Sequence, residues 1–390
     1  MKALFLAPEP FYQERGTPIA VRLLVEELAR HGWQIDLLTY HEGSEFACPN
    51  VRLMRIPNLR WVRNVRPGFS VKKLLCDIVF FREALRRLRR ERYDYIHAVE
   101  EAGFMACLIH RFTGIPYVYD MDSSIPEQIR GKRPSLIVFA PLLAAIESAA
   151  IRRAAVVLPV CNALEELARR RGAREVLLLR DTALGAPTGG REASKQPLPL
   201  PQGGSPRFLY VGNLEPYQGI DLLLSAFART LRSLTGALLL IVGGSQQDIE
   251  EYRAKTRKVH IESHVAFVGP LPVSCLPEVM AQADVLVSPR ITGRNTPMKI
   301  YSYLQSGKPI LATDMPAHRE VLTPETALLV PPEPEKVAEG LIRLATDPRF
   351  RTQLEVHGRE LAEGRFSPAT FRTTVAEFCR LMETVAAPRA

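Results

Sequence analysis

Residues 288–321 read SPRITGRNTPMKIYSYLQSGKPILATDMPAHREV, and this stretch decides the fold. It follows ADVLV at residues 283–287, a short apolar run with β-branched residues that is typical of a buried strand. Thr296 and Pro297 predict the start of a helix, with threonine as the N-cap and proline at the first helical position, and Gly307 predicts its end. The apolar run after Pro309 predicts the next strand. The stretch is therefore a strand, a loop, a helix and a second strand.

The loop before this helix has the features of an anion site. The N-terminus of a helix at the carboxyl end of a parallel strand offers unpaired N–H groups and the positive end of the helix dipole. Arg290, Arg294 and Lys299 add positive charge close to it, which suits a diphosphate better than a single carboxylate. Taken alone, the unit also fits a purely structural role, because strand–helix–strand units are common.

The block resembles the donor-binding segment of the retaining GT-B glycosyltransferases of the family 4 type, the bacterial group 1 glycosyltransferases. Their typical form is GTPxKxxEYLAxGKPVVATDxPxxREV, and this chain has TPMKIYSYLQSGKPILATD. A second segment, RFLYVGNLEPYQGIDLLLSAF at residues 207–227, resembles the family's YVGRLxxxKGxDLLLEAF. The resemblance implies an α/β protein with two doubly wound Rossmann-like domains that face each other across a cleft.

Four positions depart from the family pattern. Arg294 and Ser302 stand where relatives usually have two glutamates, the second of which binds the ribose hydroxyls of the donor. Asn213 and Gln218 stand where relatives have the arginine and lysine that bind the diphosphate. Each lost hydrogen bond to a charged group is worth about 1.5–3 kcal/mol. We expect Arg290 and Arg294 to compensate, and the Ser302 hydroxyl can still bond a ribose hydroxyl.

The resemblance implies a set of donor-binding positions along the chain. Gly16 and Thr17 stand where the family has its glycine-rich first loop, although a glycine before a helix is also a common turn. The loop that contains Leu271 is expected to hold the nucleobase edge. The expected donor-binding residues are Gly16, Thr17, Gly212, Asn213, Gln218, Gly243, Gly269, Leu271, Arg290, Arg294, Asn295, Thr296, Lys299 and Ser302.

Residues 93–130 resemble the acceptor side of the family, in which a strand with the pattern DxIHxH precedes a helix and a second strand. Polar residues at the ends of these strands give the candidate catalytic residues His97, Glu100, Asp120 and Asp122. Asp122 stands where many relatives have a histidine. Two other interpretations remain open: the aspartates can cap a turn before Pro126, and a lone histidine can be structural.

Length and composition favour two domains. The chain has 390 residues, of which 46% are hydrophobic and 24% charged, as in globular proteins. We expect an acceptor-binding domain at residues 1–184, a proline- and glycine-rich linker at 185–206, a nucleotide-sugar-binding domain at 207–372 and a C-terminal helix at 373–390 that packs back on the first domain, as in GT-B enzymes.

Scattered cysteines without ligand spacing predict free thiols and a cytoplasmic location. No apolar run is long enough to span a membrane.

The formal charge is +9, and residues 52–92 hold thirteen basic and three acidic residues. This window fits either a solvated helix face or peripheral attachment to anionic lipids at the inner face of the cytoplasmic membrane. No nucleic-acid-binding module is present.

The family resemblance implies a glycosyltransferase that moves a sugar from a nucleotide-sugar donor to the hydroxyl of a glycan, lipid or small-molecule acceptor, with retention of configuration, and we expect front-side displacement. No cofactor and no metal are expected, although the spacing of Asp120 and Asp122 superficially fits a DxD metal site. The four replaced positions support an alternative, a catalytically degenerate GT-B-like binding or scaffolding protein. A nucleotide-sugar epimerase of the same fold is disfavoured, because its acidic and histidine motifs are not evident.

Overall fold

The computed structural model describes residues 1–14, 16–63, 65, 70–126, 140–183, 201, 203–293 and 295–386. The chain divides into two compact units. Unit 1 comprises Met1–Arg180 and Phe371–Ala390, and unit 2 comprises Asp181–Thr370. Most of the expected linker, and Arg294, lie outside the described residues.

Unit 1 is built on a parallel sheet with the strand order β3-β2-β1-β4-β5-β6. Its strands are short apolar runs whose residues are almost all buried in β1, β2, β4, β5 and β6, as expected for a sheet covered on both faces. The strands are β1 (Lys2–Leu6), β2 (Gln34–Thr39), β3 (Val51–Arg55), β4 (Tyr95–Val99), β5 (Tyr117–Met121) and β6 (Val156–Pro159).

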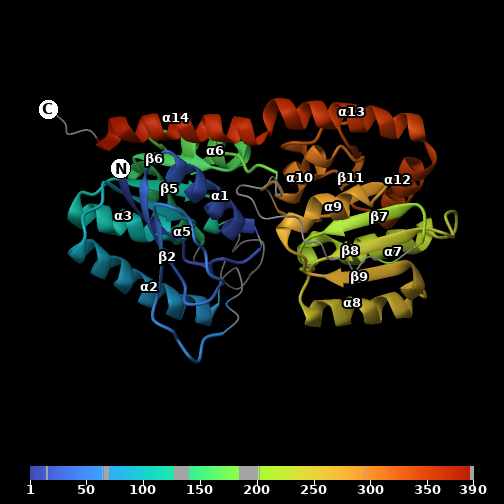
Figure 1. Ribbon diagram of the computed structural model, residues 1–390, viewed down its shortest axis with the longest axis horizontal. Helices are drawn as coiled ribbons and strands as arrows, with labels where there is room; N and C mark the ends of the chain where they lie inside the picture. Colours follow the sequence, from blue (N-terminus) through green and yellow to red (C-terminus); the bar gives the residue numbers. More distant parts are fainter. Residues whose placement is uncertain are drawn as a thin grey trace. The chain divides into compact units, whose positions relative to one another are not determined.

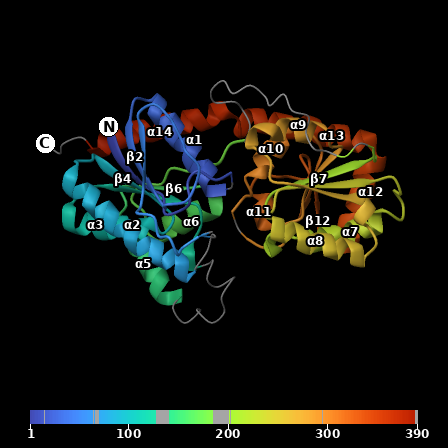
Figure 2. The ribbon, with the colours of Figure 1, turned by 60° about the horizontal axis from the view of Figure 1, so that its bottom comes forward.

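Helices cover both faces of this sheet (Figure 2). The core beneath α2, α3, α5 and α6 is separate from the core beneath α1 and α14. The segment of α14 from Phe371 onward belongs to unit 1, and its Phe378 is fully buried there. The helices are α1 (Gly16–Arg30), α2 (Val71–Arg90), α3 (Ala102–Thr113), α5 (Ala140–Arg153), α6 (Asn162–Arg170) and α14 (Pro368–Ala386).

Unit 2 has a second parallel sheet, with the order β12-β11-β10-β7-β8-β9. Helices α7, α8 and α12 cover one face, and α9, α10 and part of α13 cover the other (Figure 1). The strands are β7 (Arg207–Val211), β8 (Leu238–Val242), β9 (Val265–Gly269), β10 (Val285–Ser288), β11 (Ile310–Thr313) and β12 (Leu328–Val330). The helices are α7 (Ile220–Thr230), α8 (Gln246–Lys258), α9 (Leu276–Ala281), α10 (Lys299–Ser306), α11 (Pro316–Arg319), α12 (Pro334–Thr346) and α13 (Pro348–Arg365), with short 3₁₀ turns η2 (Pro216–Gln218), η3 (Glu262–His264) and η4 (Val273–Cys275).

Each unit is doubly wound, as the sequence predicts. The strand order reverses between β1 and β4 in unit 1 and between β7 and β10 in unit 2. In sheets of this kind, ligands bind beyond the carboxyl ends of the strands at the point of reversal. Two places are therefore candidate sites before any side chain is considered. Within the described part of the chain, no helix combines the length and the apolar character needed to cross a bilayer.

Candidate functional site

The reversal point of unit 2 gathers the residues that follow β7 and β10. Gly212 follows β7 with a φ of 147°, and the amine of Lys299 lies against its backbone. A Cβ atom on Gly212 would come within 2.9 Å of Lys299 Nζ and of the Tyr210 hydroxyl. Gly243 is equally constrained, since its Cβ would lie 2.2 Å from the carbonyl oxygen of Gly212. The two glycines therefore let the ends of β7 and β8 lie close together beneath Lys299.

Lys299 is the basic residue at the centre of this point. Its Nζ donates a hydrogen bond to Gln218 Oε1 at 3.2 Å and lies 3.9 Å from the centroid of the Tyr210 ring. Gln218, which stands where relatives have a lysine, thus contacts Lys299 of α10. Among the described residues, no carboxylate forms an ion pair with Lys299. Burial, together with the charge of Arg290, holds the Lys299 pKa well below its usual range.

Arg290 shapes the loop after β10, a role that the sequence pattern does not reveal. Its Nε donates to Thr292 O at 2.7 Å, Nη1 to Asn295 O at 3.0 Å and Nη2 to Asn295 Oδ1 at 3.1 Å. Gly293 has a φ of 109° and wraps around the guanidinium so closely that a Cβ there would lie 2.2 Å from Arg290 Nη2. Three of the five guanidinium N–H groups thus bond described residues of the loop.

The start of α10 corrects one expectation. The sequence predicts Thr296 as the N-cap, but the helix begins at Lys299, with Met298 in the capping position. Ile300 N bonds Pro297 O and Tyr301 N bonds Met298 O, so the chain turns with i to i+3 bonds before the helix is established. The Thr296 hydroxyl is buried and has no hydrogen-bond partner in the part of the chain that the structure describes. The predicted end at Gly307 is correct, since Gly307 is left-handed and bonds Leu304 O.

His318 is a buried residue of this site that the sequence analysis missed. Its ring lies between the ends of β10 and β11, where it contacts the Ser288 hydroxyl and the Thr313 carbonyl. The Thr313 hydroxyl in turn donates to the carbonyl oxygen of Arg290. Burial lowers the pKa of His318 to about 4. A neutral histidine therefore fixes the backbone from which the Arg290 loop starts.

The other expected donor residues are dispersed over both units. Asn213 is exposed, and Ser302 is buried on α10. Gly269 ends β9 and precedes the half-buried Leu271. Gly16 and Thr17 form the first turn of α1 in unit 1, and Arg294 lies outside the described residues.

In unit 1, the carboxyl ends of β4 and β5 bring the candidate catalytic residues together. His97 is fully buried, and its Nε2 lies 3.1 Å from Asp120 Oδ2. The imidazole stacks on Phe5, with ring centroids 3.9 Å apart, and meets the edge of Phe378. His97 is thus enclosed by aromatic rings, which suits a role in orienting Asp120 better than direct contact with a ligand. Asp120 itself is 8% exposed.

Acidic groups line the turn after β4. Glu100 has a φ of 49° and its backbone N donates to Asp120 O at 3.0 Å. Burial, with a further contribution from Glu101, raises the pKa of Glu100. Glu101 forms an ion pair with Lys73 of α2, and burial raises the pKa of the nearby Asp77 to about 7. A carboxylate with a raised pKa at a strand end is a candidate general base.

The loop after β5, which contains Asp122, is held from two sides. Ser123 Oγ donates to Glu100 Oε1 at 3.1 Å. Glu147 of α5 is fully buried and accepts from Ser124 Oγ at 2.9 Å and from Ile125 N at 3.0 Å. Arg171 forms an ion pair with the same carboxylate. This clamp was not predicted, because Glu147 lies far from the loop in sequence.

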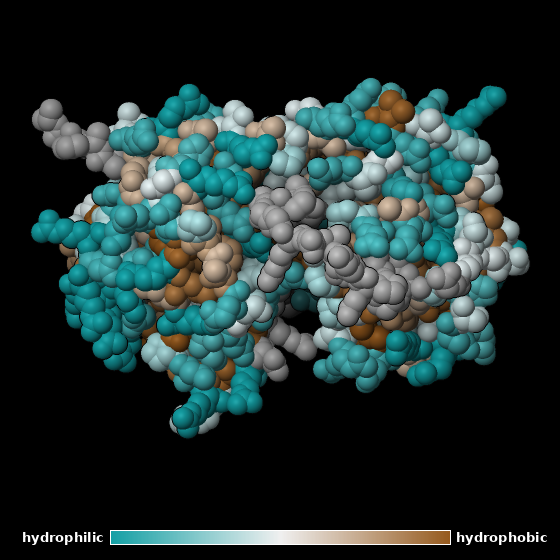
Figure 3. Space-filling view, in the orientation of Figure 1, coloured by the Kyte–Doolittle hydropathy of each residue, from teal (hydrophilic) through white to brown (hydrophobic). Residues whose placement is uncertain are grey.

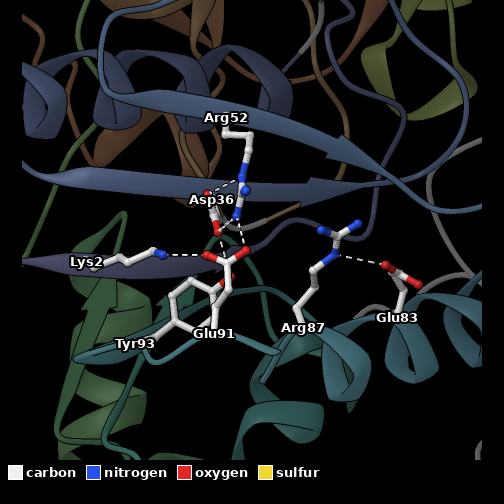
Figure 4. A network of polar contacts seen from close by, with 7 residues as sticks. All are labelled: Lys2, Asp36, Arg52, Glu83, Arg87, Glu91 and Tyr93. Carbon is white, nitrogen blue, oxygen red and sulfur yellow. Dashed lines mark hydrogen bonds and ion pairs between the residues drawn. The ribbon is translucent and has the colours of Figure 1, made fainter. Parts of the chain in front are cut away.

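Part of the basic window 52–92 is neutralised within unit 1 (Figure 4). Arg52 donates to Asp36 and to Glu91, Lys2 also bonds Glu91, and Arg87 Nε bonds Glu83 Oε1 at 2.9 Å. The described basic residues of the window that pair with no carboxylate are Arg60, Arg63, Lys72, Arg82, Arg89, Arg90 and Arg92. They lie mostly toward the two ends of α2.

The start of α2 is unusually apolar on its outer side. Val71, Leu74, Leu75 and Ile78 are 74%, 48%, 49% and 53% exposed, and they recur at helical spacing. In Figure 3, hydrophilic side chains gather over the end of α2 at the left of the view, whereas hydrophobic atoms reach the surface nearer its start. The helix thus combines an exposed apolar stripe with unpaired arginines.

Two protein families match this chain, one in each unit. The family described as glycosyl transferase 4-like domain matches residues 15–179, and the family described as glycosyl transferases group 1 matches residues 205–347. The chain belongs to the group 1 glycosyltransferases. Among the described residues, no group of three or more His, Cys, Asp or Glu side chains could hold a metal ion.

Curated relatives of this glycosyltransferase family include two mannosyltransferases. The phosphatidyl-myo-inositol mannosyltransferase of Mycobacterium leprae is 27% identical over 181 residues, which are 46% of each chain. The protein of the same name from Mycolicibacterium smegmatis is 26% identical over 230 residues, 57% of this chain and 56% of the relative. The chain thus spans about half the length of the curated relatives it matches.

Solved glycosyltransferase structures show the same fold. A sucrose-phosphate synthase from Thermosynechococcus elongatus superposes with a TM-score of 0.77 and 21% identity, covering 98% of this chain and 99% of the other. HepE from Anabaena, in complex with UDP and glucose, has a TM-score of 0.73 and 17% identity, covering 97% and 99%. These likenesses establish the GT-B architecture of two Rossmann-like domains.

Proposed function

We propose that the protein is a glycosyltransferase that moves a sugar from a nucleoside diphosphate sugar to an acceptor hydroxyl. The observation that carries this proposal is the Lys299 amine, which faces the Gly212 backbone at the reversal point of unit 2 and has no carboxylate partner among the described residues. Arg290 adds a guanidinium cation, and the buried Thr296 hydroxyl has no hydrogen-bond partner among the described residues. A basic amine, a cation and an unused hydroxyl thus meet without an anion, and a diphosphate supplies one.

The proposed reaction retains the anomeric configuration through front-side displacement. The acceptor oxygen forms its bond to the anomeric carbon on the face from which the diphosphate oxygen departs, so no protein nucleophile is required. The acceptor proton passes to the departing phosphate oxygen or to a carboxylate among Glu100, Asp120 and Asp122. Lys299 and Arg290 stabilise the negative charge that develops on the leaving group.

We propose that this charge stabilisation operates without a metal ion or other cofactor. Side chains and backbone N–H groups then take the place of a divalent cation at the diphosphate. Turnover should persist in EDTA and should not increase when Mg²⁺ or Mn²⁺ is added. A strict requirement for either ion would contradict this proposal and would indicate Asp120 and Asp122 as the metal ligands.

The acceptor that we favour is carried by a membrane, on a lipid or a glycan. The names of two curated relatives describe transfer to phosphatidyl-myo-inositol. The apolar stripe on α2 and the unpaired arginines of the same helix suit attachment to an anionic bilayer, where each basic residue contributes about 1 kcal/mol. This attachment would place the protein at the inner face of the cytoplasmic membrane.

Donor binding by thermal shift tests the proposal. UDP, GDP, ADP, TDP and CMP are each added to wild type, Lys299→Met and Arg294→Ala. At one hundred times its dissociation constant, a ligand stabilises the protein by about 2.7 kcal/mol. One nucleotide should raise the wild-type midpoint and have a weaker effect on both variants. No shift with any nucleotide would contradict the proposal and favour a binding or scaffolding protein.

A further inference from the structure

The environment of Lys299 is unusual for a lysine that binds anions. Its side chain is half-buried at the first residue of α10, with the amine between the Tyr210 ring, the Gln218 amide oxygen and the backbone of Gly212. Gln218 is itself 7% exposed. Gln218 Oε1 accepts a hydrogen bond equally well from a neutral amine or from an ammonium, so these contacts do not require the amine to be charged.

The described titratable and charged groups around Lys299 come from several elements, and none of these described groups supplies a negative charge near neutral pH. Arg290, on the loop after β10, is positive and opposes a second charge. Burial raises the pKa of Tyr210 on β7 and of Tyr303 on α10, so both stay neutral. His318 at the end of β11 is neutral, with a pKa of about 4. Tyr217, on η2, lies beneath Arg290.

One contact favours the charged form. An ammonium over the face of an aromatic ring gains about 0.5–2 kcal/mol, and Lys299 lies over Tyr210. Two effects oppose it: the removal of the amine from water, and the charge of Arg290. No carboxylate among the described residues offsets these two effects, and they hold the Lys299 pKa well below its usual range. The amine therefore loses its proton more readily than an exposed lysine.

We infer that Lys299 takes up a proton from solvent when the diphosphate of a nucleotide sugar binds, so that donor binding and protonation are coupled. This inference rests on the proposed function, and it concerns the same site. The neutral amine becomes an ammonium as the two negative charges of the diphosphate arrive, because an opposite charge nearby favours the charged form. The free protein thereby avoids a second buried positive charge beside Arg290, and the complex gains an ion pair.

The coupling has a definite sign. Because the complex holds its proton more firmly than the free protein, donor affinity decreases as the pH rises between the two pKa values of Lys299. The decrease is at most about tenfold per pH unit, the limit for one proton. Above and below that interval the affinity is independent of this group.

Isothermal titration calorimetry with UDP-glucose and GDP-mannose tests the inference. Both phosphates of these probes are esterified, so the probes have no terminal phosphate group that titrates near neutral pH. Each titration is run at pH 8 in phosphate and in Tris, which differ widely in ionisation enthalpy. Proton uptake by the complex should make the observed binding enthalpy differ between the buffers, and the affinity should decrease as the pH rises through the interval between the two pKa values.

Variants assign the proton to Lys299. Lys299→Arg keeps a permanent charge, so it should bind the probe with the same enthalpy in both buffers. Lys255→Arg, which changes an exposed lysine on α8 paired with Asp221, is the matched control and should retain the buffer dependence. Lys299→Met should bind at least tenfold more weakly than wild type.

The outcomes separate the inference from the function on which it rests. If neither probe binds and no nucleotide shifts the midpoint, the proposed function fails and the inference fails with it. If a probe binds wild type with equal enthalpy in both buffers, the donor site stands and the coupling is wrong. If buffer dependence persists in Lys299→Arg, the proton goes to another group and the assignment to Lys299 is overturned.

Discussion

The hydroxyl of Ser288 donates a hydrogen bond to Nε2 of His318, over a distance of 2.9 Å. The direction follows from the other ring nitrogen, because Nδ1 lies 2.7 Å from the carbonyl oxygen of Thr313, which can only accept. Nδ1 therefore carries the proton, and Nε2 is left as an acceptor. A protonated ring would have a second donor facing the Ser288 hydroxyl, which would have to turn away.

This arrangement predicts loss of stability in mild acid. The folded pKa of His318 is about 4, below the unfolded value of about 6.5, so the unfolded chain binds the proton more tightly. The stabilisation is complete above pH 6.5 and is lost as the pH falls toward 4. Between pH 7.5 and pH 5 the free energy of unfolding should decrease by about 2 kcal/mol from this residue. Urea unfolding of unit 2 at both values measures it.

His318→Gln is the matched variant for this prediction, since glutamine can bond Thr313 and Ser288 but does not titrate. Its own stability should change less with pH, and the difference between the two proteins should shrink as the pH falls. Parallel stability curves for wild type and variant would show that His318 does not control this transition.

Glu147 is expected to control the order of the loop that contains Asp122. Glu147→Gln removes the charge that Arg171 faces and one of the acceptors used by Ser124 and Ile125. Breaking a buried pair of this kind costs about 3 kcal/mol. Amide hydrogen exchange over residues 122–126 should become faster, and turnover should decrease while nucleotide binding to unit 2 is unchanged.

Glu83→Gln is the control for this change, because Glu83 is also a nearly buried helix glutamate that pairs with an arginine. Its partner Arg87 is more exposed, so the cost should be about 1 kcal/mol or less and exchange over 122–126 should not change. Equal exchange in wild type and Glu147→Gln would show that Glu147 does not control the order of this loop.

A substitution at Gly16 distinguishes two roles for this residue, contact with the donor phosphate or a purely structural role at the start of α1. A Cβ atom at Gly16 meets no atom within 4 Å, and the residue starts α1. Gly16→Ala should therefore leave the stability unchanged or raise it by up to about 1 kcal/mol. If the donor phosphate approaches this turn, as the family resemblance implies, the same change should weaken donor binding. Unchanged affinity would assign Gly16 to the helix alone.

The sequence predicted the architecture well because the architecture depends on local patterns. The apolar runs that became β10 and β11 are buried strands in the structure, and Gly307 ends α10 as expected. The predicted start of α10 was wrong by two residues. Thr296 and Pro297 are typical of a helix N-terminus, but the chain makes i to i+3 turns there first. Local preference does not decide between these two kinds of turn.

The details of the site depend on contacts between distant residues, and no local pattern reveals them. Lys299 bonds a residue 81 positions earlier, and Ser288 bonds one 30 positions later. Arg290 was expected, together with Arg294, to bind the diphosphate, yet three of its N–H groups bond Thr292 and Asn295 of its own loop. Whether an arginine serves a ligand or its own loop is decided by backbone geometry, such as the left-handed Gly293.

The unpaired arginines of α2 should control binding to anionic membranes. Arg82, Arg89 and Arg90 have no carboxylate partner among the described residues, and each should contribute about 1 kcal/mol near an anionic surface. The triple change to glutamine should therefore weaken binding to vesicles of phosphatidylcholine and phosphatidylglycerol by about 100-fold at low salt. Co-sedimentation of the intact protein measures this binding.

Arg87→Gln is the single-charge control. Because Arg87 is paired with Glu83, this change should weaken vesicle binding less than Arg89→Gln does. Ile78→Glu should weaken binding to the same vesicles by inserting a charge into the apolar stripe, and this loss should persist at high salt. Equal binding of wild type and all these variants would leave α2 as a solvated helix and would remove the membrane from the proposed function.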